Sequence, residues 1–75
     1  MNTFEKLRAI IVDVLEIDAG LVTQESTPKD LDADSIDLID IAGETEQTFK
    51  VEIPDDALAG FETVGDFVEY IETHL

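Results

Sequence analysis

Ser35 is the one conspicuous attachment point for chemistry in this sequence. It lies in Asp34-Ser35-Ile36, where a run of acids and small residues gives way to apolar residues at helical spacing. The chain has no cysteine, a single histidine and no glycine-rich phosphate loop. Serine and aspartate both favour helix starts, so Asp34 is predicted to be an N-cap and Ser35 the first helical residue. A purely structural cap is the commoner role for such a pair. The two roles are compatible if Asp34 caps the helix while the Ser35 hydroxyl points outward.

Length and charge restrict the possible functions. The 75 residues are expected to form one small domain, 1-75, with no room for an enclosed substrate cavity. Nineteen acids oppose four basic residues, so the surface repels nucleic acid and anionic lipid and attracts basic proteins. No stretch approaches the roughly 20 apolar residues of a membrane span, and the Met1 end lacks a signal-peptide layout. The absence of cysteine fits a reducing compartment. We therefore expect a cytoplasmic protein.

The spacing of apolar residues predicts an all-α fold. A first helix is predicted from about Thr3 to Glu16, starting with a capping box formed by Asn2 and Glu5. Residues 17–31 contain turn formers and no sustained period, which predicts a long ordered loop. The apolar residues expected to pin this loop are Leu21, Val22 and Leu31.

The second helix is predicted to run from Ser35 to Phe49 with two distinct sides. At 100° per residue, Ile36 and Ile39 fall outside the apolar stripe and within one turn of Ser35. Scattered surface isoleucines are common and need no function. The residues expected to face the core are Leu38, Ala42, Thr45 and Phe49, with Ile41 at the edge of the stripe.

Two further helices are predicted after Pro54, which stops the preceding segment. Asp55 or Asp56 is expected to cap a short helix. A last helix is predicted to begin at Thr63, with Asp66 in capping-box position. Its expected apolar residues are Val64, Phe67, Val68 and Ile71, and Phe61 is expected to anchor the turn before it. The predicted fold is a small bundle of three main helices plus one short helix, with a long loop between the first two helices.

The segment from Asp30 to Asp37, DLDADSID, resembles the modification site of an acyl carrier protein, a phosphopantetheine-dependent carrier. The resemblance covers nearly the whole chain, including Phe49 at the end of the second helix and the segment Val51–Asp55. It implies that a phosphopantetheinyl transferase moves 4′-phosphopantetheine from coenzyme A onto Ser35, beside Asp34. Acyl groups would then travel as thioesters to enzymes of fatty acid or polyketide synthesis. The start of a helix stabilises an exposed phosphate by roughly 0.3–1 kcal/mol.

The exposed side of the second helix is expected to dock partner enzymes. A charge run on a helix is usually only a solvated face, but the resemblance implies contact with basic surfaces of acyl-transfer and synthase enzymes. Such contacts set encounter rate and selectivity more than affinity. The carrier is expected to be a monomer. The predicted partner-binding residues are Ile36, Asp37, Ile39, Asp40, Gly43 and Glu44.

Several residues depart from the family pattern. Asp32 stands where the family commonly has glycine, and residues 43–45 occupy a stretch that is usually more apolar. Gly43 weakens a helix interior by roughly 0.5–1 kcal/mol and changes the partner-facing surface. Thr45 is expected to narrow the hydrophobic lining. Our hypothesis is a specialised carrier of a short or polar acyl group.

Other functions stay open alongside this one. An aminoacyl or peptidyl carrier of a nonribosomal pathway would use the same scaffold, and an acidic adaptor would use it unmodified. The segment from Asp30 also resembles the start of a calcium-binding loop but lacks two required residues. Ser35 replaces the glycine that a calcium loop requires, and Ile41 replaces its bidentate glutamate. No metal site is expected, and no catalysis, because the only histidine, His74, lies beside the C-terminus. The three calcium-like positions are Asp30, Asp32 and Asp34.

Overall fold

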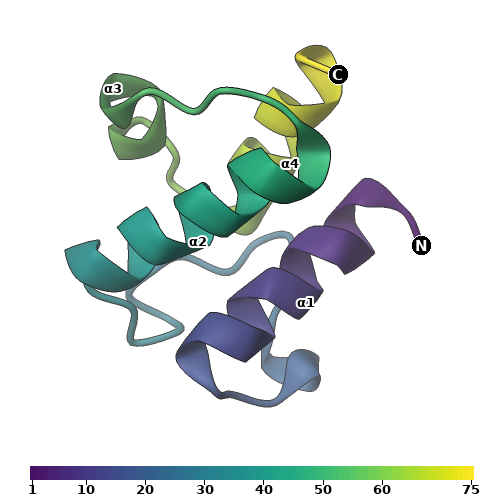
Figure 1. Cartoon of the computed structure of the whole chain (residues 1–75). Helices are drawn as coiled ribbons and strands as arrows, with labels where there is room; N and C mark the ends of the chain where they lie inside the picture. Colours follow the sequence, from purple (N-terminus) through teal and green to yellow (C-terminus); the bar gives the residue numbers. More distant parts are fainter.

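A computed structural model describes all 75 residues as helices joined by ordered loops, without a β-strand (Figure 1). In chain order the elements are α1 (Thr3–Leu15), the 3-10 helix η1 (Ala19–Leu21), α2 (Ser35–Phe49), α3 (Asp55–Ala59) and α4 (Val64–Thr73). The predicted all-α fold, with three main helices, one short helix and a long loop, is confirmed. The additional η1 turn within that loop was not predicted. No helix is both long and apolar enough to cross a bilayer.

Each of the three long helices begins with a capping box. In every case the N-cap side chain accepts a hydrogen bond from the third helical residue, whose acidic side chain accepts one from the N-cap backbone. These reciprocal bonds satisfy amides that have no partner within the helix. The sequence therefore determines where the helices start. The pairs are Asn2 with Glu5, Asp34 with Asp37, and Thr63 with Asp66.

The short helix α3 starts differently from our expectation. Pro54, with φ −61°, is its N-cap, and no side chain completes the cap. Asp55 and Asp56 are instead the first two helical residues, so neither caps the helix. Proline lacks a backbone N–H, but no intrahelical hydrogen bond uses that N–H at the start of a helix, and the fixed φ of proline is compatible with this position. Pro54 therefore both interrupts the preceding segment and marks the start of α3.

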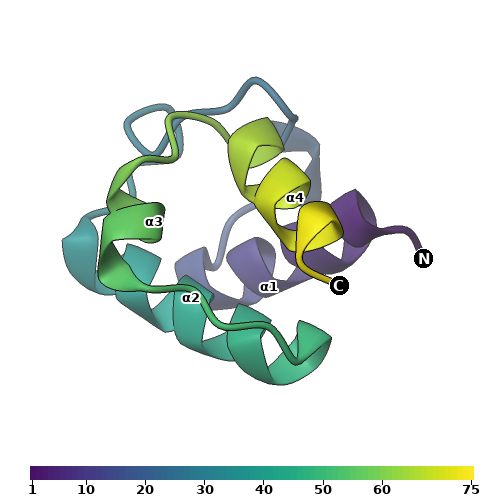
Figure 2. The ribbon, with the colours of Figure 1, turned by 90° about the horizontal axis from the view of Figure 1, so that it is seen from above.

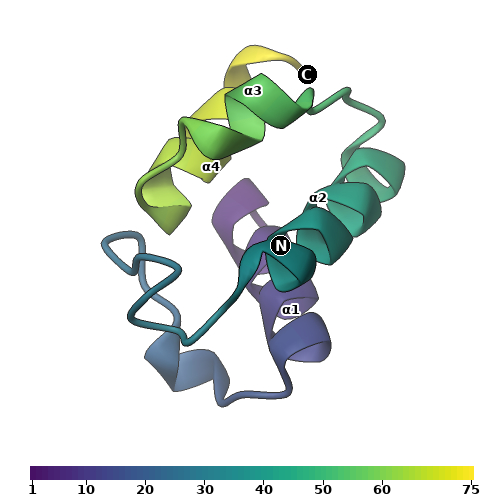
Figure 3. The ribbon, with the colours of Figure 1, turned by 90° about the vertical axis from the view of Figure 1, so that its left-hand side faces the viewer.

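Helix α1 forms the centre of the packing. It contacts both α2 and α4, and it runs in the opposite direction to α2 in two perpendicular views (Figures 1 and 2). The start of α2 and the short α3 lie at one end of the molecule, which faces the viewer in Figure 3. The core residues are Leu7, Ile10, Ile11, Val22, Ile41, Ala42, Val51, Ile53, Val64, Phe67, Val68 and Ile71.

Three of the predicted packing positions need correction. Leu21, expected to pin the loop, is 61% exposed, because η1 turns it outward, whereas Val22 is buried as predicted and Leu31 packs at the edge of the core. Ile41, placed at the edge of the apolar stripe, is 3% exposed and lies well inside it. Leu38 is only half-buried. The true centre of the stripe therefore lies nearer Ile41 than the helical wheel indicated.

Two backbone hydrogen bonds fix the long loop against the start of α4. The Val64 N–H donates to the Ser26 carbonyl at 2.9 Å, and the Gly65 N–H donates to the Gln24 carbonyl at 2.8 Å. A Cβ atom at Gly65 would stand 3.0 Å from the Gln24 carbonyl oxygen, so glycine permits this approach. The loop is thus held by hydrogen bonds and by Val22, which explains how a segment without regular structure stays ordered.

Asp32 has a left-handed backbone, with φ 57°. The other two non-glycine residues with positive φ, Glu16 and Lys50, are helix C-caps, where this conformation is common. A side chain with a Cβ is disfavoured in this region, although aspartate tolerates it better than most residues. The positive φ at this position therefore explains why the family commonly has glycine where this chain has Asp32.

Replacing Asp32 with glycine should raise the free energy of unfolding by about 0.5–1 kcal/mol, because glycine adopts positive φ without a Cβ penalty. Urea unfolding monitored by circular dichroism measures the change. Asp32→Asn is the matched control, since asparagine removes the charge but keeps the Cβ. Equal stabilisation by both variants would identify charge repulsion, rather than backbone conformation, as the cause.

Candidate functional site

Ser35 is the first residue of α2 and its side chain is exposed. The Ser35 hydroxyl makes no hydrogen bond within the chain, since the capping interactions at this helix start use Asp34 and Asp37. The predicted exposure of Ser35 and the predicted N-cap Asp34 are both confirmed. A primary alcohol that is solvent-exposed and unbonded can be reached by a second protein.

The start of α2 is fixed by two carboxylates that bond to the backbone. The Asp37 N–H donates to Asp34 Oδ1 at 2.9 Å, and the Asp34 N–H donates to Asp37 Oδ2 at 3.2 Å. The next amide, that of Leu38, donates to the Asp34 carbonyl at 3.1 Å. The N–H groups of Ser35 and Ile36 have no acceptor in the chain.

These two free amides suit a phosphate attached at Ser35. They lie at the positive end of the α2 dipole, which stabilises an exposed anion by roughly 0.3–1 kcal/mol. The nearby carboxylates of Asp34 and Asp37 oppose this attraction, but each already accepts a backbone hydrogen bond. The residues present are therefore compatible with a covalently bound phosphate at this position.

The predicted partner-binding residues lie mainly on the exposed side of α2. Ile36 and Ile39 are 68% and 61% exposed, which confirms that neither belongs to the core. Asp40 and Glu44 are also exposed, and Gly43 is half-buried. Asp37 differs from the others because it is half-buried and serves in the capping box. The structure thus places two large apolar side chains beside a flank of carboxylates, next to Ser35.

A small apolar pocket lies beneath the first two turns of α2. Its volume is about 50 Å³, which is too small for a large substrate. We had expected no room for an enclosed substrate cavity, and this small pocket was not predicted. The pocket is lined by residues of all four α-helices, the segments between them and the long loop. Its 13 lining residues, 10 of them hydrophobic, are Ile11, Leu15, Ser26, Pro28, Leu31, Ala33, Leu38, Ile41, Leu58, Phe61, Thr63, Val64 and Phe67.

Thr45 does not line this pocket, so the predicted narrowing of the lining by Thr45 is wrong. The residue is fully buried, at 0% exposure, and its hydroxyl donates to the Ile41 carbonyl at 2.7 Å. This bond satisfies the hydroxyl inside the core. Thr45 therefore contributes to the packing of α2, while Leu38 and Ile41 form the α2 wall of the pocket.

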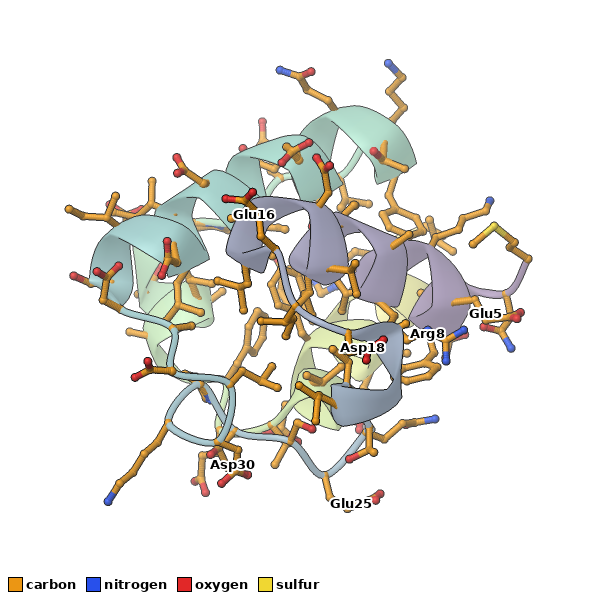
Figure 4. The ribbon with its side chains drawn as sticks, turned by 90° about the horizontal axis from the view of Figure 1, so that it is seen from below. Glu5, Arg8, Glu16, Asp18, Glu25 and Asp30 are labelled. Atoms are coloured by element: carbon orange, nitrogen blue, oxygen red, sulfur yellow. The ribbon has the colours of Figure 1, made fainter.

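Asp30, Asp32 and Asp34 are not gathered into a preformed cluster of metal ligands. No group of three or more histidine or acidic side chains converges closely enough to hold a metal ion. Asp30 instead forms reciprocal bonds with Thr27, at 3.0 and 3.1 Å. Figure 4 shows Asp30 on the loop, pointing away from the body of the protein and apart from Glu16 at the end of α1. The divalent-cation alternative therefore has no preformed site.

His74 is exposed as predicted, but it is not a free tail residue. Its ring stacks on Tyr70, with centroids 3.9 Å apart, and its Nδ1 lies 2.7 Å from the Tyr70 carbonyl oxygen. The Tyr70 hydroxyl in turn donates to the Glu52 carbonyl at 2.9 Å. His74 is thus part of the structure that ends α4, and no contact connects it with Ser35.

Comparison with known proteins gives a consistent result over nearly the full length. The profile of the family described as "Phosphopantetheine attachment site" matches residues 5–71, a range that contains Ser35 and all of α2. The chain is 46% identical over 72 residues to the acyl carrier protein of Clostridium perfringens, covering 95% of each chain. It is 41% identical over 75 residues to the acyl carrier protein of Helicobacter hepaticus, covering 99% of each.

The capping role of Asp34 can be measured as stability. Asp34→Ala should lower the free energy of unfolding by about 1 kcal/mol, because the Asp37 amide loses its acceptor. Asp34→Asn should retain most of that stability, and Ser35→Ala should change it by less than about 0.5 kcal/mol, since its hydroxyl bonds to nothing. Urea titrations of the three variants test this. An equally large loss in Ser35→Ala would contradict the assignment of the cap to Asp34.

Proposed function

This chain belongs to the acyl carrier proteins of the phosphopantetheine-attachment family, and on that basis we propose that Ser35 carries the 4′-phosphopantetheine arm. Acyl carrier proteins are carriers and not catalysts, and they hold acyl groups as thioesters on the thiol that the arm supplies. One observation carries the assignment to Ser35: its hydroxyl is exposed and unbonded at a helix start that has two free amides.

A separate transferase supplies the base for attachment at Ser35, because no histidine of the chain lies beside that hydroxyl. The Ser35 oxygen forms a bond to the phosphorus that bears the pantetheine group of coenzyme A, and the pyrophosphate P–O bond breaks. Adenosine 3′,5′-bisphosphate leaves, and the hydroxyl proton passes to a base of the transferase. The only histidine lies at the end of α4, held by Tyr70. Asp34, predicted as a cofactor-binding residue, acts by fixing the position of Ser35.

The partners are the transferases and synthases that act on acyl carrier proteins, and we assign the docking surface to α2. The exposed isoleucines Ile36 and Ile39 provide an apolar contact, and Asp37, Asp40 and Glu44 attract basic residues. Charge complementarity of this kind speeds association and selects partners while leaving the complex weak. We further propose that residues 1–75 act as a single carrier domain, monomeric and cytoplasmic, in fatty acid or polyketide synthesis.

The assignment of Ser35 is tested by modification in vitro. Incubation with coenzyme A and a broad-specificity phosphopantetheinyl transferase should add one phosphopantetheine to the wild-type chain, detected by intact-protein mass spectrometry. Ser35→Ala should gain no mass, although its fold is retained. A mass gain in Ser35→Ala would move the attachment elsewhere, and no gain in either protein would refute the carrier function and favour an unmodified adaptor.

The small pocket supports a short acyl cargo. Its lining is apolar and lies close to the helix start at Ser35, on the inner side of α2, through Ala33 and Leu38. Each buried CH₂ group contributes about 0.8 kcal/mol. A volume of about 50 Å³ accommodates only a small part of a long chain without expansion of the core.

Stabilisation by the cargo should therefore level off after a few carbons. Carriers loaded with acetyl, butyryl, octanoyl and dodecanoyl groups can be compared by urea unfolding, with the unacylated thiol form as reference. We expect a gain of about 0.8 kcal/mol per buried CH₂ for the shortest chains and little beyond them. Continuing stabilisation up to dodecanoyl would show that the pocket expands, and would contradict a carrier adapted to short groups.

A further inference from the structure

Phe61 lies between two hollows of the structure, the apolar pocket beneath α2 and a more open one along α4. The open hollow has a volume of about 290 Å³, and its lining residues are Phe61, Asp66, Glu69, Tyr70 and Thr73. Asp66, Glu69 and Thr73 are exposed, so this hollow is largely polar. Of the residues that line either hollow, only Phe61 lines both. Its side chain therefore separates an apolar interior from a polar surface.

Aromatic residues of α4 hold the Phe61 ring in place. The ring centroid of Phe61 lies 4.7 Å from that of Phe67 and 5.4 Å from that of Tyr70, and both pairs are tilted. Tilted pairs at such distances are favourable beyond the area that they bury. Phe67 is buried, and the Tyr70 hydroxyl donates to the Glu52 carbonyl at 2.9 Å. Because both supporting rings are themselves fixed, and close-packed side chains yield little, Phe61 forms a firm wall of the pocket.

This wall lies where a lengthening acyl group would reach it. Ala33 and Leu38 line the pocket next to the start of α2, where an arm on Ser35 brings in its cargo. Phe61 and Phe67 line the pocket next to α4. An acyl chain that enters at α2 and extends toward α4 therefore meets the Phe61 ring before it reaches the open hollow.

We propose that Phe61 is a specificity-determining residue that sets the length of the acyl group, because its ring closes the pocket toward the hollow along α4. This inference rests on the proposed carriage of acyl groups on Ser35, and it names acyl groups of a few carbons as the cargo that fits. A longer chain has to displace the ring from its aromatic neighbours. Beyond the ring it reaches the exposed carboxylates of Asp66 and Glu69, which offer no apolar contact. Both effects oppose insertion past Phe61.

Two variants at position 61 and one matched control test the proposal. Phe61→Ala removes the ring and opens a space beside Phe67 and Tyr70, and Phe61→Leu opens part of that space. Ile71→Ala is the control, because Ile71 is a fully buried residue of α4 that lines neither hollow. A broad-specificity phosphopantetheinyl transferase loads each protein from coenzyme A or from acetyl-, butyryl-, octanoyl- or dodecanoyl-coenzyme A. Thermal unfolding then gives the Tm gained with each acyl group, relative to the thiol form of the same variant.

We expect the Tm gain of the wild type to be complete at butyryl, whereas that of Phe61→Ala continues to octanoyl. Each additional buried CH₂ group should raise Tm by about 3–6 °C. Phe61→Leu should be intermediate. Ile71→Ala should level off at butyryl as the wild type does, although its own Tm is lower.

Tyr70 provides a second measurement, which does not depend on stability. It is the only tyrosine, and the chain has no tryptophan, so the intrinsic fluorescence of the protein reports on the surroundings of Tyr70. An octanoyl group should change this fluorescence in both Phe61 variants and leave it unchanged in the wild type.

Three results would overturn the proposal. The first is that both Phe61 variants level off at the same chain length as the wild type, with unchanged Tyr70 fluorescence. The second is that Ile71→Ala extends the series as far as Phe61→Ala does, and the third is that the wild type itself gains Tm up to dodecanoyl. Failure of the wild-type chain to accept any arm would instead refute the carrier function itself.

Discussion

The reciprocal bonds between Asp34 and Asp37 are the interaction on which the rest of the site depends. They end the long loop and begin α2 at a defined residue, so that the next side chain, Ser35, stands free of the protein. The same register turns Ile41 and Ala42 into the core and leaves Ile36 and Ile39 in solvent. A shift of one residue in this start would rotate every α2 side chain by about 100°. Attachment, docking and packing are therefore fixed by one local structure.

Some of the many acidic side chains accept hydrogen bonds from the backbone within the fold. Besides the three capping boxes, Glu46 accepts a hydrogen bond from the Ile53 amide at 2.7 Å and so ties α2 to the segment before α3. Two of the four basic residues lie over aromatic rings, Lys6 over Phe49 and Arg8 over Phe4. A cation over an aromatic ring is a favourable electrostatic contact, and the Lys6–Phe49 pair links α1 to the last residue of α2. Of the remaining carboxylates, Asp40 and Glu44 give the exposed side of α2 its negative charge.

Local features of the sequence predicted most of the architecture, because capping residues and helical spacing act over a few positions. Asn2, Thr63 and Asp34 were identified as helix starts on this basis, and the exposure of Ser35 and Ile36 followed from the same register. Features that depend on distant contacts were missed. The pocket forms only when all four α-helices and the loop meet, and the outward turn of Leu21 depends on η1. The positive φ of Asp32 was signalled only by the family's preference for glycine.

The two backbone bonds that join Ser26 to Val64 and Gln24 to Gly65 also bear on how the chain folds. Helices normally acquire their contacts from near neighbours, which makes small helical proteins fast folders. Here the first two amides of α4, those of Val64 and Gly65, gain their acceptors only when segments from opposite halves of the chain meet, after the closure entropy of the intervening chain has been lost. The two bonds between the loop and α4 are non-local contacts, because they join residues that are far apart in the sequence. They raise the contact order of a bundle whose short helices otherwise form mostly local contacts.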